Sequence, residues 1–167
     1  MPIHTPPWSR PVVRGEESIW VVPSLINYTT LGDVWIGQQV RDKNLHDSPG
    51  TFRWLKHYIR MRSPIRVNVN GCPKTYQEAG KDFLSTLIEF TMEELGVGRD
   101  EEVAFTVPVE AFEHYECWLT EVAEKAGVSR FRLIDEPSAA ALGYGISLQP
   151  NNVYMVFIYV YSRTALA

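Results

Sequence analysis

Cysteine is scarce in this sequence, with only Cys72 and Cys117 among its 167 residues. One pair is arithmetically possible, but two thiols do not make a disulfide framework, so we expect a reducing compartment. The N-terminal segment MPIHTPPWSRPVVRGEE has no apolar core of a signal peptide. The longest apolar run, Val153–Tyr161, is too short to span a bilayer. These absences predict a cytoplasmic protein that contacts no membrane.

An excess of positive charge is also absent. The formal net charge is −4, and the sequence isoelectric point is about 5.6, so the overall balance gives no reason to expect a nucleic-acid partner. Hydrophobic residues make up 45% of the chain, which predicts one folded domain with a real core. Residues 1–17 carry four prolines, and we expect an irregular leader there.

The rest of the sequence alternates between strand and helix patterns. We expect short strands at 18–22, 24–28, 34–36 and 65–69, and a helix after Ser48-Pro49-Gly50 that carries Phe52, Leu55 and Ile59 inward. A long helix follows the capping box of Thr75 and Glu78 and ends near Gly96. Beyond it, strands at 103–107, 131–134 and 153–160 alternate with helices. This order predicts an α/β fold with parallel pairing.

Asp135 and Glu136 lie at a predicted junction between a strand and a helix, directly before Pro137. Pro137 suits a first helical position, and acidic groups at strand ends of an α/β sheet lie where such sheets bind ligands. From the residues alone, Glu136 is either such a ligand-facing group or an acid that favours the helix N-terminus. His114 and Cys117 share a helix face, but no second pair completes a metal site.

Five segments in order resemble the nucleotide-binding domain of the heat-shock 70-kDa (DnaK-like) chaperones, which are actin-like ATPases with a ribonuclease H-like fold. They are PSLINYT (23–29), VWIGQQV (34–40), GTFRWLKHYI (50–59), AFTVPVEAF (104–112) and IDEPSAAALGYG (134–145). The resemblance implies that residues 18–167 form part of lobe I, a mixed sheet with flanking helices that is incomplete here. It also implies ATP and Mg²⁺ as cofactors, and J-domain proteins and nucleotide exchange factors as partners.

The resemblance assigns catalytic positions to Lys56 and Glu136. In the family, the lysine of GTFRWLKHYI lies beside the terminal phosphate, and the glutamate of IDEPSAAALGYG lies near the magnesium ion and the attacking water. Taken alone, Lys56 also fits a solvated helix face with Arg53, His57 and Arg60, or a nucleic-acid patch.

Pro108 corresponds to a relay between the nucleotide and the substrate domain in the family. A strand terminator is the plainer interpretation. The family has an arginine eight residues further on, but this sequence has Glu116. A glutamate in place of this arginine reverses the charge and removes the basic hydrogen-bond donor that the relay between the nucleotide and the substrate domain would use.

Both glycine-rich phosphate turns of the family are missing from their expected positions. Gly15 is the only glycine in residues 1–22, and the segment after Phe157 reads Ile158-Tyr159-Val160-Tyr161, without glycine. Glycines let backbone N–H groups approach phosphate closely, and the aspartates that order magnesium are absent too. The second lobe and the substrate-binding domain are also missing, so we expect a partial chaperone ATPase domain that does not hydrolyse ATP alone.

Two other functions stay open from the sequence. One is a non-enzymatic interaction module derived from the same lobe, which the missing phosphate turns favour. The other is a different actin-like ATPase, such as a sugar kinase or filament protein, which GTFRWLKHYI fits less well. Val153–Tyr161 is apolar, uncharged and aromatic, and we expect it to promote self-association if it lacks neighbouring strands.

Overall fold

The computed structural model describes residues 7–14, 17–109 and 112–143. Its strands are β1 (Arg10–Arg14), β2 (Glu17–Val21), β3 (Ile26–Tyr28), β4 (Val34–Ile36), β5 (Thr51–Phe52), β6 (Arg66–Val69), β7 (Cys72–Thr75), β8 (Glu102–Val107) and β9 (Arg130–Asp135). Its helices are α1 (Gln38–Asp42), α2 (Leu55–Arg60), α3 (Tyr76–Leu95), α4 (Phe112–Lys125) and α5 (Glu136–Gly143). The strand predicted at 153–160 and the self-association segment lie outside the described residues.

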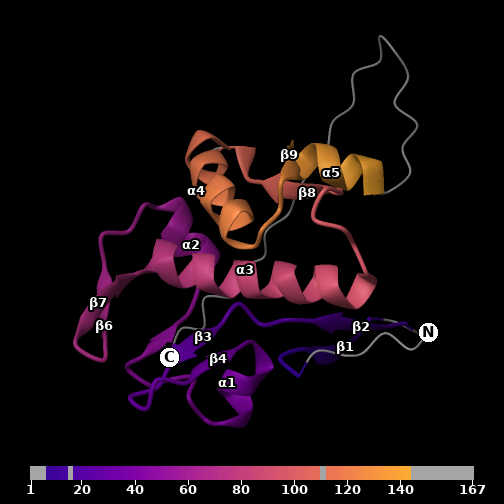
Figure 1. The fold of residues 1–167 in the computed structure, drawn as a ribbon. Coiled ribbons are helices and arrows are strands. Elements are labelled where there is room, and N and C mark those ends of the chain that lie inside the picture. The colour runs from indigo at the N-terminus through magenta and orange to yellow at the C-terminus, as the bar shows by residue number, and fades with distance from the viewer. Residues whose placement is uncertain (1–6, 15–16, 110–111, 144–167) are drawn as a thin grey trace.

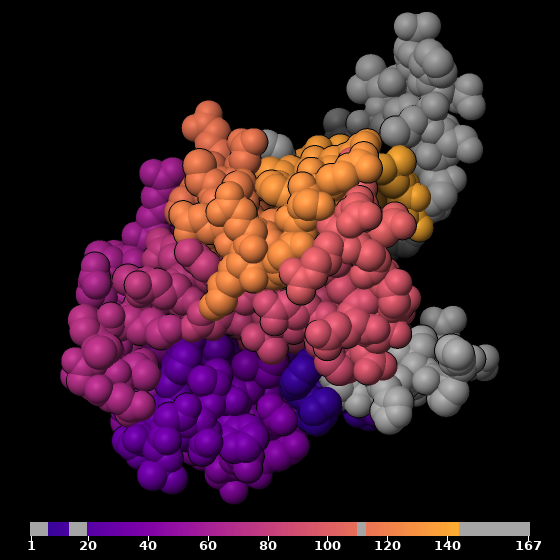
Figure 2. Space-filling view, viewed as in Figure 1, coloured from indigo at the N-terminus to yellow at the C-terminus, as the bar shows by residue number. Residues whose placement is uncertain are grey.

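The long helix α3 runs through the middle of the molecule. On one side of it lie β1 to β4 and α1, and on the other lie α4, β8, β9 and α5 (Figure 1). The space-filling view shows the same order on one face, with the N-terminal residues below and the orange C-terminal ones above (Figure 2). None of the helices in the described ranges is long and apolar enough to cross a membrane.

The fold is mixed α/β, as predicted, but its strands are distributed among small sheets. Over the described residues these are a β1–β2 ribbon, a β4–β3–β5 sheet, a β6–β7 ribbon and a β8–β9 pair. The predicted single mixed sheet is therefore not formed by this part of the chain. The one parallel pair is β8–β9, with α4 as its crossover helix, which confirms the predicted parallel pairing at this place.

The expected irregular leader is wrong for residues 10–14. They form β1, which pairs antiparallel with β2 and sets Pro11 opposite Trp20. Proline has no N–H to donate, but each strand of a two-stranded ribbon has one open edge, where a missing donor costs little. The prolines therefore did not prevent pairing as the composition suggested.

The region from 24 to 60 confirms most of its predicted features. The hairpin is formed by β3 and β4, and Phe52, Leu55 and Ile59 are all buried. The helix begins later than predicted, at Leu55, because residues 51–52 form β5 and pair with β3. A buried hydrogen bond of 2.8 Å from the Asn27 side chain to the Thr51 hydroxyl supports this pairing.

Helix α3 has the predicted ends but a different buried surface. The Thr75–Glu78 capping box is complete, and Gly96 ends the helix in the left-handed region, with φ of 62°. Leu95 and Thr91, which the helical spacing places on the same face as the buried Tyr76, Ala79 and Phe83, are exposed, Leu95 to 62%. Gly80, Ser85 and Met92 are buried instead. Because α3 packs against α2 and α4 as well as β3 and β7, its buried surface is wider than one stripe.

Asp82 of α3 joins three elements through charged hydrogen bonds. Its carboxylate accepts from the Tyr28 hydroxyl of β3 at 2.5 Å, from Lys74 of β7 at 2.5 Å, and from Lys125 of α4. Burial would raise the pKa of Asp82, but the hydrogen bonds from Lys125, Lys74 and Tyr28 outweigh it and lower the pKa. Burial and the contact with Asp82 in turn raise the pKa of Tyr28. Asp82 therefore connects the two sides of α3.

We expect Asp82→Asn to lower the free energy of unfolding by about 2 kcal/mol, since it removes the charged acceptor of three donors. Folding lowers the pKa of Asp82. Its contribution to the free energy of unfolding is therefore complete above a pH of about 4, the ordinary pKa of an aspartate, and is lost as the pH falls through the lowered pKa of the folded state. Urea unfolding near pH 7 and near pH 3 measures both effects.

Glu121→Gln is the matched control, because Glu121 pairs with Lys81 but is 57% exposed. It should cost at most about 1 kcal/mol. Equal losses in the two variants, or an Asp82→Asn protein as acid-sensitive as the parent, would contradict the assignment.

Candidate functional site

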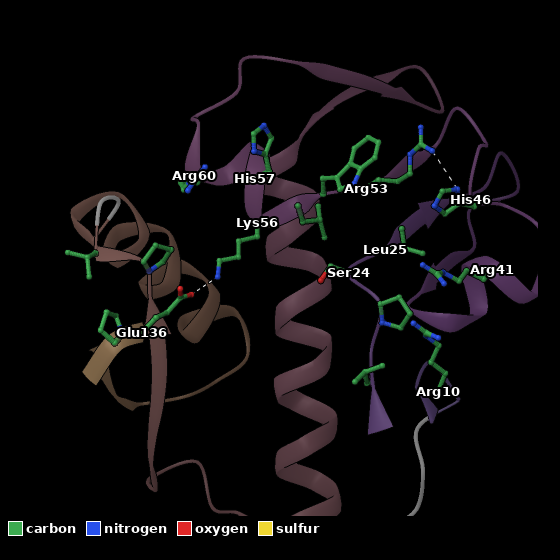
Figure 3. Close-up of a pocket in the computed structure, with 17 residues that line it drawn as sticks. Arg10, Ser24, Leu25, Arg41, His46, Arg53, Lys56, His57, Arg60 and Glu136 are labelled. Atoms are coloured by element: carbon green, nitrogen blue, oxygen red, sulfur yellow. Dashed lines mark hydrogen bonds and ion pairs between the residues drawn. The ribbon is translucent and has the colours of Figure 1, made fainter. Parts of the chain in front are cut away.

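A cleft of about 750 Å³ lies between two groups of elements (Figure 3). Helix α2 and the ends of β8 and β9 form one side of it, and β1 and α1 form the other. This volume is in the range of small-molecule sites. Its cationic lining residues are Arg10, Arg41, Arg53, Lys56 and Arg60, with His46 and His57 beside them. Among the described residues, Glu136 is the one carboxylate of the lining. The cleft therefore favours anions, although the chain as a whole is acidic.

Lys56 and Glu136, predicted as catalytic residues, meet in this cleft. The Lys56 ammonium donates to Oε1 of Glu136 across 80 positions of sequence (Figure 3). The Glu136 side chain is 29% exposed and that of Lys56 is 63% exposed. An ammonium and a carboxylate are thus both presented to the cleft from different parts of the chain.

Pro108 lies beside Glu136 because of the strand register. Val107, the last residue of β8, pairs with Asp135, the last residue of β9. Pro108 and Glu136 follow these two residues, so both stand at the carboxyl ends of parallel strands and both line the cleft. This edge is where open α/β sheets bind ligands. Glu116 is exposed on α4 and does not line the cleft.

Asp135 makes the capping contacts of α5. One carboxylate oxygen accepts from the backbone N–H of Ser138 at 2.8 Å, and the other accepts from its hydroxyl at 2.7 Å. The hydrogen bonds from the Ser138 hydroxyl and then from its N–H lower the pKa of Asp135. Glu136 lies in the first turn of α5, where a negative charge is favoured, but its side chain is directed to Lys56 instead of to the helix backbone.

Helix α2, which carries Lys56, is fixed by α3 and α4. Ile59 packs so closely on Gly80 of α3 that a Cβ at that position would collide with it. From α4, the Tyr115 hydroxyl donates to the Lys56 carbonyl at 2.9 Å, and Nε2 of His114 donates to the Ile59 carbonyl at 2.8 Å. Burial raises the pKa of Tyr115 to about 12, while Arg60 lowers it and Glu136 adds to the rise, so the phenol remains a donor at neutral pH.

Trp54 precedes α2 in an unfavourable backbone conformation. Its φ of 54° and ψ of 38° lie in the left-handed region, and it provides no side-chain cap. The indole is 64% exposed, lines the cleft, and has the Arg53 guanidinium 4.9 Å from its ring centroid. A large aromatic side chain is therefore held at the opening of the cleft by a backbone conformation that is uncommon for it.

The described side chains around the cleft offer few ligands for a metal ion. Among residues 7–14, 17–109 and 112–143, no group of three His, Cys, Asp or Glu side chains is placed to hold a metal ion. His114 donates to the Ile59 carbonyl, and Cys117 is an exposed free thiol. Within the described lining, Glu136 is the carboxylate nearest to Lys56, with which it pairs.

Sequence reasoning missed several residues of this site. Arg10 fell in the expected leader, and Arg41 carried no motif. No motif marked Tyr115 as a contact of α2, and His114 was considered only as half of an incomplete metal pair. Their contacts to α2 span 59 and 55 positions. No local pattern signals such a contact.

The fold and the site together define the class as an α/β protein with a cleft that is lined mainly by cations at the ends of two parallel strands. Its relatives are chaperones. The chain is 26% identical to the chaperone protein dnaK of Guillardia theta over 87% of its own length and 27% of that protein. It is 26% identical to a chaperone protein HscA homolog of Methylococcus capsulatus, with 82% and 25% covered. It is 30% identical to the chaperone protein DnaK of Mycoplasmoides gallisepticum, with 81% and 23% covered.

The chain is thus similar to part of a heat-shock 70-kDa chaperone, as its five motifs predicted. It spans about a quarter of the length of the curated relatives it matches. No family model matches the chain.

We expect Tyr115→Phe to lower the free energy of unfolding by about 1 kcal/mol, because the Lys56 carbonyl loses its donor from α4. Hydrogen exchange of the backbone amides in α2 should also accelerate. Tyr58→Phe is the control, because Tyr58 stacks on Tyr76 and its hydroxyl has no hydrogen bond within the described part of the chain. Unchanged exchange in α2 of the Tyr115→Phe protein would show that this hydroxyl does not position Lys56.

Proposed function

We propose that this chain forms the phosphate-facing part of a chaperone-type nucleotide site within an actin-like ATPase lobe. The observation that carries the proposal is the pairing of Lys56 with Glu136 at the carboxyl ends of β8 and β9, inside a cleft lined mainly by cations. Lys56 and Glu136 are the positions that the resemblance assigns to the terminal phosphate and to the magnesium and water.

The side chains fit a nucleotide phosphate better than they fit a fully coordinated magnesium ion. Lys56 and Arg60 supply donors to phosphate oxygens from one helix. A phosphate that contacts Lys56 competes with Glu136 and then faces its carboxylate. A divalent cation bound with the phosphate would offset this repulsion, so ATP is expected to bind with Mg²⁺ and more weakly without it.

The proposal does not include ATP hydrolysis by this chain alone. Backbone N–H groups of glycine-rich turns are needed to enclose the phosphates and align the attacking water. The sequence has neither turn at the expected positions, and residues 158–161 are bulky. In this proposal, Pro108 contributes to the shape of the cleft, while Glu116 does not act as its relay partner.

The expected setting follows from the resemblance. The chain would act in the cytoplasm, with J-domain proteins and nucleotide exchange factors as candidate partners. The second candidate function is an interaction module derived from the same lobe. It is favoured by the missing phosphate turns and by the arginines that line the far side of the cleft.

Calorimetric titration with ATP and Mg²⁺ tests the nucleotide proposal. We expect weak, saturable binding, and we expect Lys56→Ala and Glu136→Ala to reduce the affinity by at least about tenfold. Phosphate release should not exceed the rate without protein.

Lys81→Ala and Glu121→Ala are matched controls, because this Lys–Glu pair lies outside the cleft. They should bind ATP as the parent does. If circular dichroism shows a folded chain that takes up no ATP at about millimolar concentration, the nucleotide proposal is wrong and the interaction module becomes the favoured function.

A further inference from the structure

The cleft has a second cationic side, opposite the Lys56–Glu136 pair. Arg10 of β1, Arg41 of α1 and Arg53 before α2 form this side, which we call the arginine wall. Figure 3 shows Arg10 and Arg41 across the cleft from Lys56 and Glu136. The wall is built by parts of the chain far apart in sequence, so it is a product of the fold and not of a local basic run.

Two arginines of the wall have no partner of opposite charge among the residues that the structure describes. Arg53 donates to Asp47 at 2.7 Å, but Arg10 and Arg41 form no ion pair within the described residues. Both are exposed. Among the residues that the structure describes, the lining of the cleft includes five Lys and Arg side chains and one carboxylate, that of Glu136. This segregation leaves guanidinium groups available for bidentate pairing with an anion.

The wall is not only cationic. The cleft is also lined by the half-buried Val21 and Pro23 and by the exposed Trp54. Trp54 is 64% exposed, although it is among the largest apolar side chains. An inorganic anion or a nucleic-acid backbone would satisfy the arginines but would leave this apolar surface in water. A ligand complementary to both must carry negative and apolar groups close together.

We propose that the arginine wall binds a polypeptide segment in which acidic side chains alternate with apolar ones. Carboxylates pair with Arg10 and Arg41, and the apolar side chains pack on Trp54 and the residues beside it. Exposed aromatic residues with arginines nearby are typical anchors of protein interfaces. This inference concerns the far side of the cleft and is independent of the nucleotide proposal.

Fluorescence anisotropy with three labelled twelve-residue peptides tests the inference. The first alternates Glu with Leu, the second alternates Glu with Ser, and the third alternates Lys with Leu. We expect saturable binding of the Glu–Leu peptide that weakens as salt increases. The other two peptides should bind at least about tenfold more weakly, because each lacks one of the two complementary features.

The double variant Arg10→Gln/Arg41→Gln should lower the affinity for the Glu–Leu peptide roughly tenfold, as expected for the loss of two exposed ion pairs. The double variant Arg66→Gln/Arg130→Gln is the control. It removes the same charge from exposed strand positions outside the cleft and should bind as the parent does. Lys81→Ala, which removes a cation outside the cleft, should also retain peptide binding.

Four outcomes would overturn the inference. Equal binding of the Glu–Ser peptide, or full displacement by inorganic tripolyphosphate at matched charge, would indicate a simple polyanion site. Equal losses in the two double variants would indicate an effect of net charge alone. Absence of saturable binding to a folded chain would remove the site altogether.

Discussion

The site depends on the fixation of α2 between α3 and α4. A helix of six residues is too short to be stable by itself, so its position is set by tertiary contacts. Ile59 packs on Gly80, and the hydroxyl of Tyr115 and the ring of His114 bind two of its carbonyls. Every cation that α2 brings to the cleft is placed through these contacts. The cleft therefore depends on the core beneath it.

That core also explains how Arg10 of β1 and Glu136 of α5, which are far apart in the sequence, line the same cleft. Asp82 on α3 binds groups from β3, β7 and α4, so the elements on both sides of the long helix keep fixed positions relative to it. Besides a smaller cluster around Met92 and Val128, buried residues from Ile26 to Val122 form one large cluster. Arg10 and Glu136 can line one cleft because this cluster holds their elements together.

The features that the sequence predicted well are those with local physical causes. The Thr75–Glu78 capping box, the end of α3 at Gly96 and the hairpin between β3 and β4 each depend on a few neighbouring residues. Lys56 and Glu136 are 80 positions apart, and only the family resemblance, which assigns both to one nucleotide site, predicted that they lie together. Arg10, Arg41 and Tyr115 were missed because their roles arise only when segments far apart in sequence meet. The proline-rich start was misjudged since open strand edges tolerate proline.

Glu136 determines how the two sides of the cleft differ. By pairing with Lys56, it neutralises the cation that a phosphate would need, so a ligand on that side must compete with an existing ion pair. Arg10 and Arg41 face no such competition within the described residues. An anion approaching the cleft is attracted by the summed positive charge, but it pairs first where no carboxylate has to be displaced. The two proposals therefore assign different ligands to the two sides of the cleft, carboxylates to the side with unpaired arginines and a phosphate accompanied by a cation to the side with the Lys56–Glu136 pair.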